Sequence, residues 1–195
     1  MDRAARRLAA RTASISWRMA GVTAPSPAVA SASDTPGADE RFVGGHPLAG
    51  AEVSGVDHAR EDLFDGATWY LTPQPTTSGV LLERVHRFLT GFGARPEVVD
   101  PADHDRTMAA VSHLPHVLAN VLVTQAATAL SEESEHLPEV GPSFRDATRV
   151  AGANPAIWGD IYRSNRAAIV EEIRGFRREL DEVERRLEAG EVEGW

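Results

Sequence analysis

Residues 67–99 read ATWYLTPQPTTSGVLLERVHRFLTGFGARPEVV, and this stretch decides the fold. Its first segment, Ala67 to Leu71, is rich in aromatic and β-branched residues and is closed by a Thr-Pro pair, which is typical of a β-strand. Ser78 can cap a helix that runs to Phe92, because apolar residues then recur at helical spacing. Gly91 and Gly93 end this helix, and Pro96 to Val99 follow as another short strand. A strand, a helix and a strand in this order predict part of an α/β sheet.

Upstream, the sequence predicts one further strand and an N-terminal segment of a different character. Residues 41–43 (RFV) have the pattern of a short strand that runs into Gly44-Gly45. Residues 1–40 are rich in Ala, Ser and Pro, and they carry several arginines but no acid between Asp2 and Asp34. Either an Arg-rich targeting peptide or a disordered or mis-started N-terminus would have this composition. We favour the second interpretation, because the prolines and the Ser/Ala run build no core.

Downstream of Asp100 the apolar residues recur only at helical spacing. We expect a helix from Asp103 to Leu130, an acidic loop, a short helix over Ser143 to Ala151, and one long helix that starts at Pro155. In the last helix a heptad-like seam recurs at steps of four and three residues: Ile169, Ile173, Phe176, Leu180, Val183 and Leu187. Such a seam fits packing on the chain's own core or against a second subunit.

Composition excludes several classes of function. The chain has 195 residues, of which 42% are hydrophobic, so it can form a core, and its net charge of −9 argues against a nucleic-acid partner. It lacks cysteine, so it has neither disulfides nor a thiolate metal site. It also lacks lysine, which excludes a Schiff-base or phosphate-loop lysine. No run of 18 apolar residues occurs, so we expect no transmembrane helix.

Four short motifs carry residues suited to chemistry. Residues 45–50 (GHPLAG) hold His46 between a glycine and a proline, followed by Glu52. A histidine at a strand end can act as a base near neutral pH, although such residues are also common on surface loops. The pair His104-Asp105 is interpreted as a helix-start cap.

The other two motifs lie in the helical part. Residues 112–116 (SHLPH) place two histidines three apart and a proline that should kink the helix. A metal site there lacks an obvious third ligand, so we expect no metal. Residues 143–151 (SFRDATRVA) place Arg145 and Arg149 four apart, where a guanidinium could clamp a carboxylate or simply face solvent.

Taken together, GGHPLAGAEVSG, HD, SHLPH, FRDATR and NPAIW resemble the prephenate dehydrogenase family from about Arg41 to the C-terminus. The resemblance implies a partial α/β fold, the C-terminal remnant of a Rossmann domain over residues 41–102, followed by an all-α helical dimerisation domain over residues 103–195. It implies NAD(P)-dependent oxidative decarboxylation of prephenate in tyrosine biosynthesis by a cytoplasmic homodimer that binds neither nucleic acid nor membrane. Arogenate dehydrogenase, or a non-catalytic dimerisation or ligand-sensing module, are the alternatives.

The resemblance also implies roles for individual residues. The family's catalytic histidine falls on His46, and its substrate-binding arginine falls on Arg149. His116 matches a polar contact to substrate, and Glu52 and Asp146 match acidic residues near the mouth of the cleft.

One part of the family pattern is missing from the sequence. No G-x-G-x-x-G run follows a strand, so the cofactor-binding residues for NAD or NADP are unknown. Residues 1–40 look unrelated to the family, as if translation began late or in another frame. We therefore expect this chain, as written, not to turn over prephenate.

Overall fold

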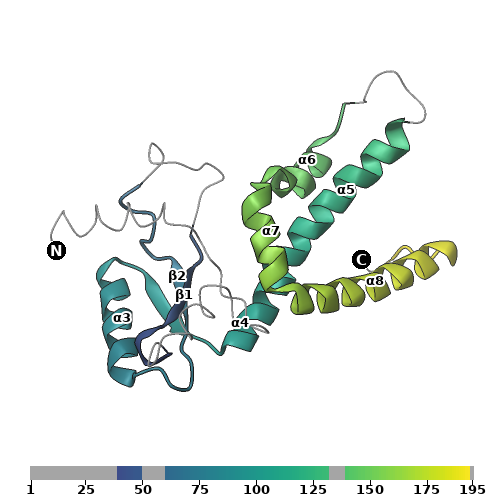
Figure 1. Cartoon of the computed structure of the whole chain (residues 1–195). Coiled ribbons are helices and arrows are strands. Elements are labelled where there is room, and N and C mark those ends of the chain that lie inside the picture. The colour runs from purple at the N-terminus through teal and green to yellow at the C-terminus, as the bar shows by residue number, and fades with distance from the viewer. Residues whose placement is uncertain (1–38, 50–59, 132–138, 194–195) are drawn as a thin grey trace. The chain divides into compact units, whose positions relative to one another are not determined.

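The computed structural model describes residues 39–49, 60–131 and 139–193, and it separates into two compact units (Figure 1). The first unit runs to Asp105 and the second begins at Arg106. The first contains a small sheet with one crossover helix, and the second is helical. The predicted fold class, a partial α/β sheet followed by a helical region, is therefore confirmed.

Among the described residues the sheet has three strands, in the order β1-β2-β3. Strand β2 (Thr68–Thr72) and strand β3 (Arg95–Val98) are parallel and are joined by helix α3 (Gly79–Gly91), so the predicted strand–helix–strand unit is present. Parallel strands need such a crossover, because the chain must return to the end of the sheet at which the first strand began. Gly91 ends α3 as expected, and Gly93 adopts a left-handed φ of 85° that suits glycine.

The third strand begins later than the sequence suggested. Residues Asp39–Arg41 form a 3-10 turn, and β1 spans Gly44–Pro47, antiparallel to β2. The strand predicted over residues 41–43 is therefore wrong, and its place is taken by the glycine pair and His46. Glycine has poor strand propensity, but here the two backbones approach closely. A Cβ on Gly45 would lie 2.9 Å from Nε1 of Trp69, and one on Gly44 would collide with Oγ1 of Thr72.

A few apolar side chains hold the first unit together. The buried ones are Phe64, Leu71, Leu89 and Ala94, and Leu71 is nearly inaccessible at 1% exposure. The apolar face predicted for α3 is only partly covered, since Leu89 is buried while Val80 and Phe88 are exposed. Ser78 stands at the N-cap position of α3, as predicted, but its side chain makes no capping hydrogen bond.

The helical segment that begins at Pro101 changes its winding near the SHLPH motif. Helix α4 (Pro101–Met108) passes into a five-residue π-helix (Ala109–His113), and α5 (Leu114–Ser131) follows directly. The π turn lies just before Pro115, which has no backbone N–H to donate and crowds the preceding turn. The distortion expected from the proline is therefore a local π turn in the helix.

One helical stretch, Pro101–Ala129, is long and apolar enough to cross a bilayer by length and composition alone. A single helix of this kind carries no argument for a membrane, because core helices of soluble proteins pass the same test. Its buried residues include His104, Asp105, His113 and His116.

The remaining helices correct a second expectation. Helix α6 (Pro142–Thr148) leads into a 3-10 turn (Arg149–Gly152), and the helix expected from Pro155 onward is in fact two helices, α7 (Pro155–Ser164) and α8 (Arg166–Glu188). They meet at Asn165 and point in different directions (Figure 1). Asn165 is buried, and its amide nitrogen lies 3.2 Å from Nδ1 of His113. The break falls at this buried polar residue, which stands four residues after Ile161 and four residues before Ile169.

The close approach of β1 and β2 gives a test of stability. Gly44→Ala should lower the free energy of unfolding by about 1–3 kcal/mol, the usual range for overpacking, because the new methyl meets buried Thr72. Gly79→Ala is the matched control, since its Cβ would meet nothing within 4 Å. Urea unfolding followed by circular dichroism measures both, and equal effects of the two substitutions would contradict the packing argument.

Candidate active site

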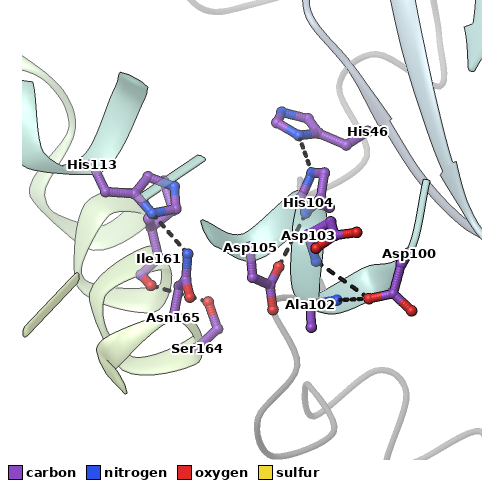
Figure 2. Close-up of polar contacts among 10 residues, drawn as sticks. All are labelled: His46, Asp100, Ala102, Asp103, His104, Asp105, His113, Ile161, Ser164 and Asn165. Carbon is purple, nitrogen blue, oxygen red and sulfur yellow. Dashed lines mark hydrogen bonds and ion pairs between the residues drawn. The ribbon is translucent and has the colours of Figure 1, made fainter. Parts of the chain in front are cut away.

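His46 lies in strand β1, directly opposite Tyr70 of β2. It is half-buried, and its Nδ1 is 2.9 Å from Nε2 of His104, which lies in α4 (Figure 2). The two rings meet edge to face, with centroids 5.1 Å apart, and Tyr70 makes a similar contact with His104 at 5.7 Å. His104 is therefore held between one strand pair and its own helix.

The chain of contacts continues from His104 into Asp105. Nδ1 of His104 is 3.0 Å from Oδ1 of Asp105, and the two residues are only 5% and 3% exposed. The interpretation of this pair as a helix cap is wrong. Asp100 caps α4 instead, accepting hydrogen bonds from the backbone N–H groups of Ala102 at 2.8 Å and Asp103 at 3.3 Å. Because Asp100 fills the capping position, His104 and Asp105 are left to pack inside the unit.

His116, in the second unit, has a different environment. Its ring stacks face to face on Trp158, with centroids 3.5 Å apart and planes 2° from parallel. Its Nδ1 lies 2.5 Å from the hydroxyl of Tyr162 and 3.3 Å from the amide nitrogen of Asn120. That amide nitrogen also donates to the backbone carbonyl of His116 at 2.8 Å, which fixes its orientation because a carbonyl can only accept.

These contacts determine which nitrogen of His116 carries the proton. Burial lowers the pKa of His116 and raises the pKa of Tyr162, so a neutral imidazole faces a phenol that keeps its proton. With Tyr162 and Asn120 both donating to Nδ1, the proton of the ring lies on Nε2. That Nε2 is buried and has no hydrogen-bond partner among the residues that the structure describes. An unsatisfied buried donor costs free energy, so it is a place where a ligand oxygen would bind favourably.

The acidic and basic residues predicted around the site lie in exposed positions or outside the described residues. Arg145 and Asp146 are exposed on α6, and Arg149 is exposed where the 3-10 turn begins, not within the same helix as Arg145. Glu52 lies outside the described residues. Tyr162 could not be found from the sequence, because it lies on another helix, 46 residues after His116. Asn120 lies four residues after His116, so helical spacing was the signal that could have found it.

The described residues do not by themselves fit a dinucleotide pyrophosphate. Such a site needs backbone N–H groups at a helix N-terminus that a glycine-rich turn opens to close approach. Within residues 39–49 and 60–105, the glycine pair of β1 packs closely against Thr72 and Trp69 and so leaves no room there for a phosphate. Helix α3 begins at Gly79 without a glycine-rich turn before it.

Two family models match consecutive parts of the chain. The model described as "Prephenate dehydrogenase, nucleotide-binding domain" matches residues 24–98, and "Prephenate dehydrogenase, dimerization domain" matches residues 100–195. The first match begins upstream of Arg41, so the similarity extends further toward the N-terminus than the motifs suggested.

Individual relatives agree with the family models. The chain is 37% identical to the prephenate dehydrogenase of Bacillus subtilis over 158 residues, which are 78% of this chain and 41% of that protein. Prephenate dehydrogenase from A. aeolicus, solved with hydroxyphenyl propionate and NAD+, superposes with a TM-score of 0.74 at 34% identity, over 79% of this chain and 54% of that one. Synechocystis arogenate dehydrogenase gives 0.67 at 30% identity, over 78% and 55%. The chain thus spans about two-fifths of the length of the curated relative and about half of the solved ones.

The buried state of His116 predicts a pH dependence. Its pKa in the folded chain lies below the ordinary 6.5, so the unfolded chain binds this proton more readily. The free energy of unfolding should therefore be level above about pH 6.5 and fall as pH drops from there through the lowered pKa. In His116→Gln this component should vanish while the other histidines still titrate. Urea midpoints across this range, with an NMR titration of the ring, measure it, and a His116 pKa at or above 6.5 would refute the assignment.

Proposed function

We propose a function on the premise that this chain belongs to the prephenate dehydrogenase family, whose two domain models match residues 24–98 and 100–195. The chain handles the substrate in the oxidative decarboxylation of prephenate to 4-hydroxyphenylpyruvate. In that reaction the ring hydroxyl loses its proton, hydride leaves the carbon that bears it, and carbon dioxide departs as the ring becomes aromatic.

The observation that carries this proposal is Nε2 of His116, which is buried and has no hydrogen-bond partner among the residues that the structure describes. It is a neutral, buried donor, held from behind by Tyr162 and Asn120 and covered on one face by Trp158. Such a donor suits a carboxylate or carbonyl oxygen, and prephenate carries both groups. His116 is therefore our candidate for a polar contact to the substrate, in agreement with the family motif.

Arg149 is our candidate for the carboxylate clamp. A guanidinium offers paired donors to a carboxylate, and the substrate carries two negative charges. Arg149 is an exposed residue at the start of a 3-10 turn. Asp146 lies one turn earlier in α6 and is exposed as well, and we propose it, together with Glu52, as an acidic residue at the mouth of the cleft.

His46 is our candidate for the base that takes the hydroxyl proton. It lies on a strand that close packing with β2 holds in place, and imidazole accepts protons near neutral pH. NAD or NADP is the hydride acceptor that the family implies for the complete protein, which we expect to be cytoplasmic and to bind neither nucleic acid nor membrane.

The similarity to Synechocystis arogenate dehydrogenase supports a second candidate substrate. Arogenate carries an amino acid group where prephenate carries a keto acid. Turnover of both compounds by a complete enzyme that contains this chain, compared as kcat/KM, decides between them.

We propose a homodimer that forms through helix α8 of the helical unit. The seam starts at Ile169, which is 5% exposed, but Leu180 and Leu187 toward its end are 49% and 56% exposed. Apolar side chains at heptad spacing that the chain leaves open are typical of a helix that packs on a second copy. The name of the matching domain model supports this assignment.

The carboxylate clamp predicts an effect on substrate binding. In a complete enzyme that carries this chain, Arg149→Ala should raise KM for prephenate more than tenfold, because losing one partner of a charge-assisted pair costs about 2–5 kcal/mol. Arg145→Ala, also exposed and four residues earlier, is the matched control and should change KM little. Steady-state kinetics of both variants test this, and a change below twofold for Arg149→Ala would remove it from the site.

The seam predicts the oligomeric state. Sedimentation of the chain at micromolar concentration should give a dimer, and Leu180→Glu with Leu187→Glu should give a monomer, because two charges would be buried without partners. Arg178→Glu, exposed on the same helix but off the seam, should leave the dimer intact. A monomeric parent chain would refute the proposal.

A further inference from the structure

We propose that His104 and Asp105 form a positioning pair behind His46: they keep its proton on Nδ1 and so leave Nε2 as the atom that accepts the proton of the substrate. This inference rests on the proposed function, in which His46 is the base. The observation behind it is the line of contacts from His46 through His104 to Asp105, two of whose three members are almost fully buried (Figure 2).

The line of contacts starts at the carboxylate. An ionised aspartate can only accept hydrogen bonds, so Nδ1 of His104, 3.0 Å from Oδ1 of Asp105, must donate. A neutral imidazole carries one proton, and Asp105 therefore commits His104 to the Nδ1–H form. Nε2 of His104 is left with a lone pair.

The lone pair on Nε2 of His104 in turn determines the proton position on His46. Nε2 of His104 lies 2.9 Å from Nδ1 of His46, so Nδ1 of His46 must donate into that lone pair. The proton of His46 is thus fixed on Nδ1, and its lone pair lies on Nε2. In Figure 2 the second ring nitrogen of His46 is on the side of the ring away from His104.

The geometry makes this pair suitable for positioning. His104 is held by contacts from two strands, edge to face with His46 of β1 and Tyr70 of β2, while Asp100 anchors the start of its helix. When Nε2 of His46 gains a proton, the positive charge forms at the end of a hydrogen-bonded line that terminates in a carboxylate. That arrangement stabilises the imidazolium without moving any group.

The opposite arrangement gives the test its contrast. If His104 were protonated on both nitrogens, its Nε2 would donate to Nδ1 of His46, and the proton of His46 would lie on Nε2. His46 could then not act as a base through that atom. The two arrangements differ in the proton position on both rings, which can be measured without turnover.

The experiment is a long-range proton–nitrogen NMR correlation of the imidazole rings in the nitrogen-15-labelled 195-residue chain, above the ordinary imidazole pKa of about 6.5. His46→Gln and His104→Gln assign the signals. We expect both His46 and His104 in the Nδ1–H form, which is the minor form of a solvent-exposed histidine. His46 in the Nε2–H form, or a doubly protonated His104, would overturn the proposal.

Substitutions at Asp105 test whether this carboxylate fixes the proton of His46 on Nδ1. Asp105→Asn adds donors in place of an acceptor-only group, so His46 should lose its pure Nδ1–H form, and Asp105→Glu should retain it. Asp103→Asn removes the same charge from an exposed position of the same helix and should change neither ring. An unchanged His46 signal in Asp105→Asn would refute the positioning role.

A kinetic arm separates this inference from the proposed function. In a complete enzyme, Asp105→Asn should lower kcat by roughly 10²–10⁴-fold, the usual contribution of a general base, with KM for prephenate nearly unchanged. If the parent enzyme fails to turn over prephenate, the proposed function fails, while the NMR result still decides the positioning pair. If the parent is active and Asp105→Asn keeps full kcat, the inference is wrong and the function stands.

Discussion

The constraint on which this structure depends is that each buried histidine of the described residues is bonded through at least one ring nitrogen. His104, His113 and His116 all lie on the helical segment that begins at Pro101, and none is more than 5% exposed. Each is bonded to a residue outside its own turn of helix or to a neighbouring acid: His104 to His46 and Asp105, His113 to Asn165, and His116 to Tyr162. A buried polar group that loses its partner costs about 1–3 kcal/mol of stability. These contacts therefore favour the observed packing of the elements within each unit.

The parts of the fold that the sequence predicted well are those governed by local rules. Strands β2 and β3 were indicated by short segments with strand-forming residues, and helix α3 between them by apolar residues at helical spacing. Glycines mark the end of that helix. Strand β1 was misplaced, because local propensity disfavours glycine, whereas the tertiary contact with Thr72 and Trp69 requires it. Propensity rules carry no information about such a close approach of two backbones.

The break at Asn165 and the role of His104-Asp105 were missed for a related reason. Asn165 stands at a buried position between Ile161 and Ile169, and its partner there, His113, lies 52 residues earlier in the sequence. An acid near a helix start is usually a cap, but Asp100 already satisfies the first N–H groups. The sequence offers three acids near this helix start, Asp100, Asp103 and Asp105, and only the three-dimensional structure shows which of them caps the helix and which bonds a histidine. For the individual roles of Arg149 and Asp146, the exposed positions fit the predicted contacts with solute, and those roles stay predictions.

A neutral histidine can present either a donor or an acceptor at Nε2. In this chain the group that contacts Nδ1 determines which of the two it presents. Behind His116 lie a phenol that keeps its proton and an amide nitrogen, both donors, so the ring presents Nε2–H outward. Behind His46 lies the Nε2 lone pair that we assign to His104, so the ring presents a lone pair instead. On this assignment, the surroundings of the two histidines, and not their residue type, prevent them from exchanging roles.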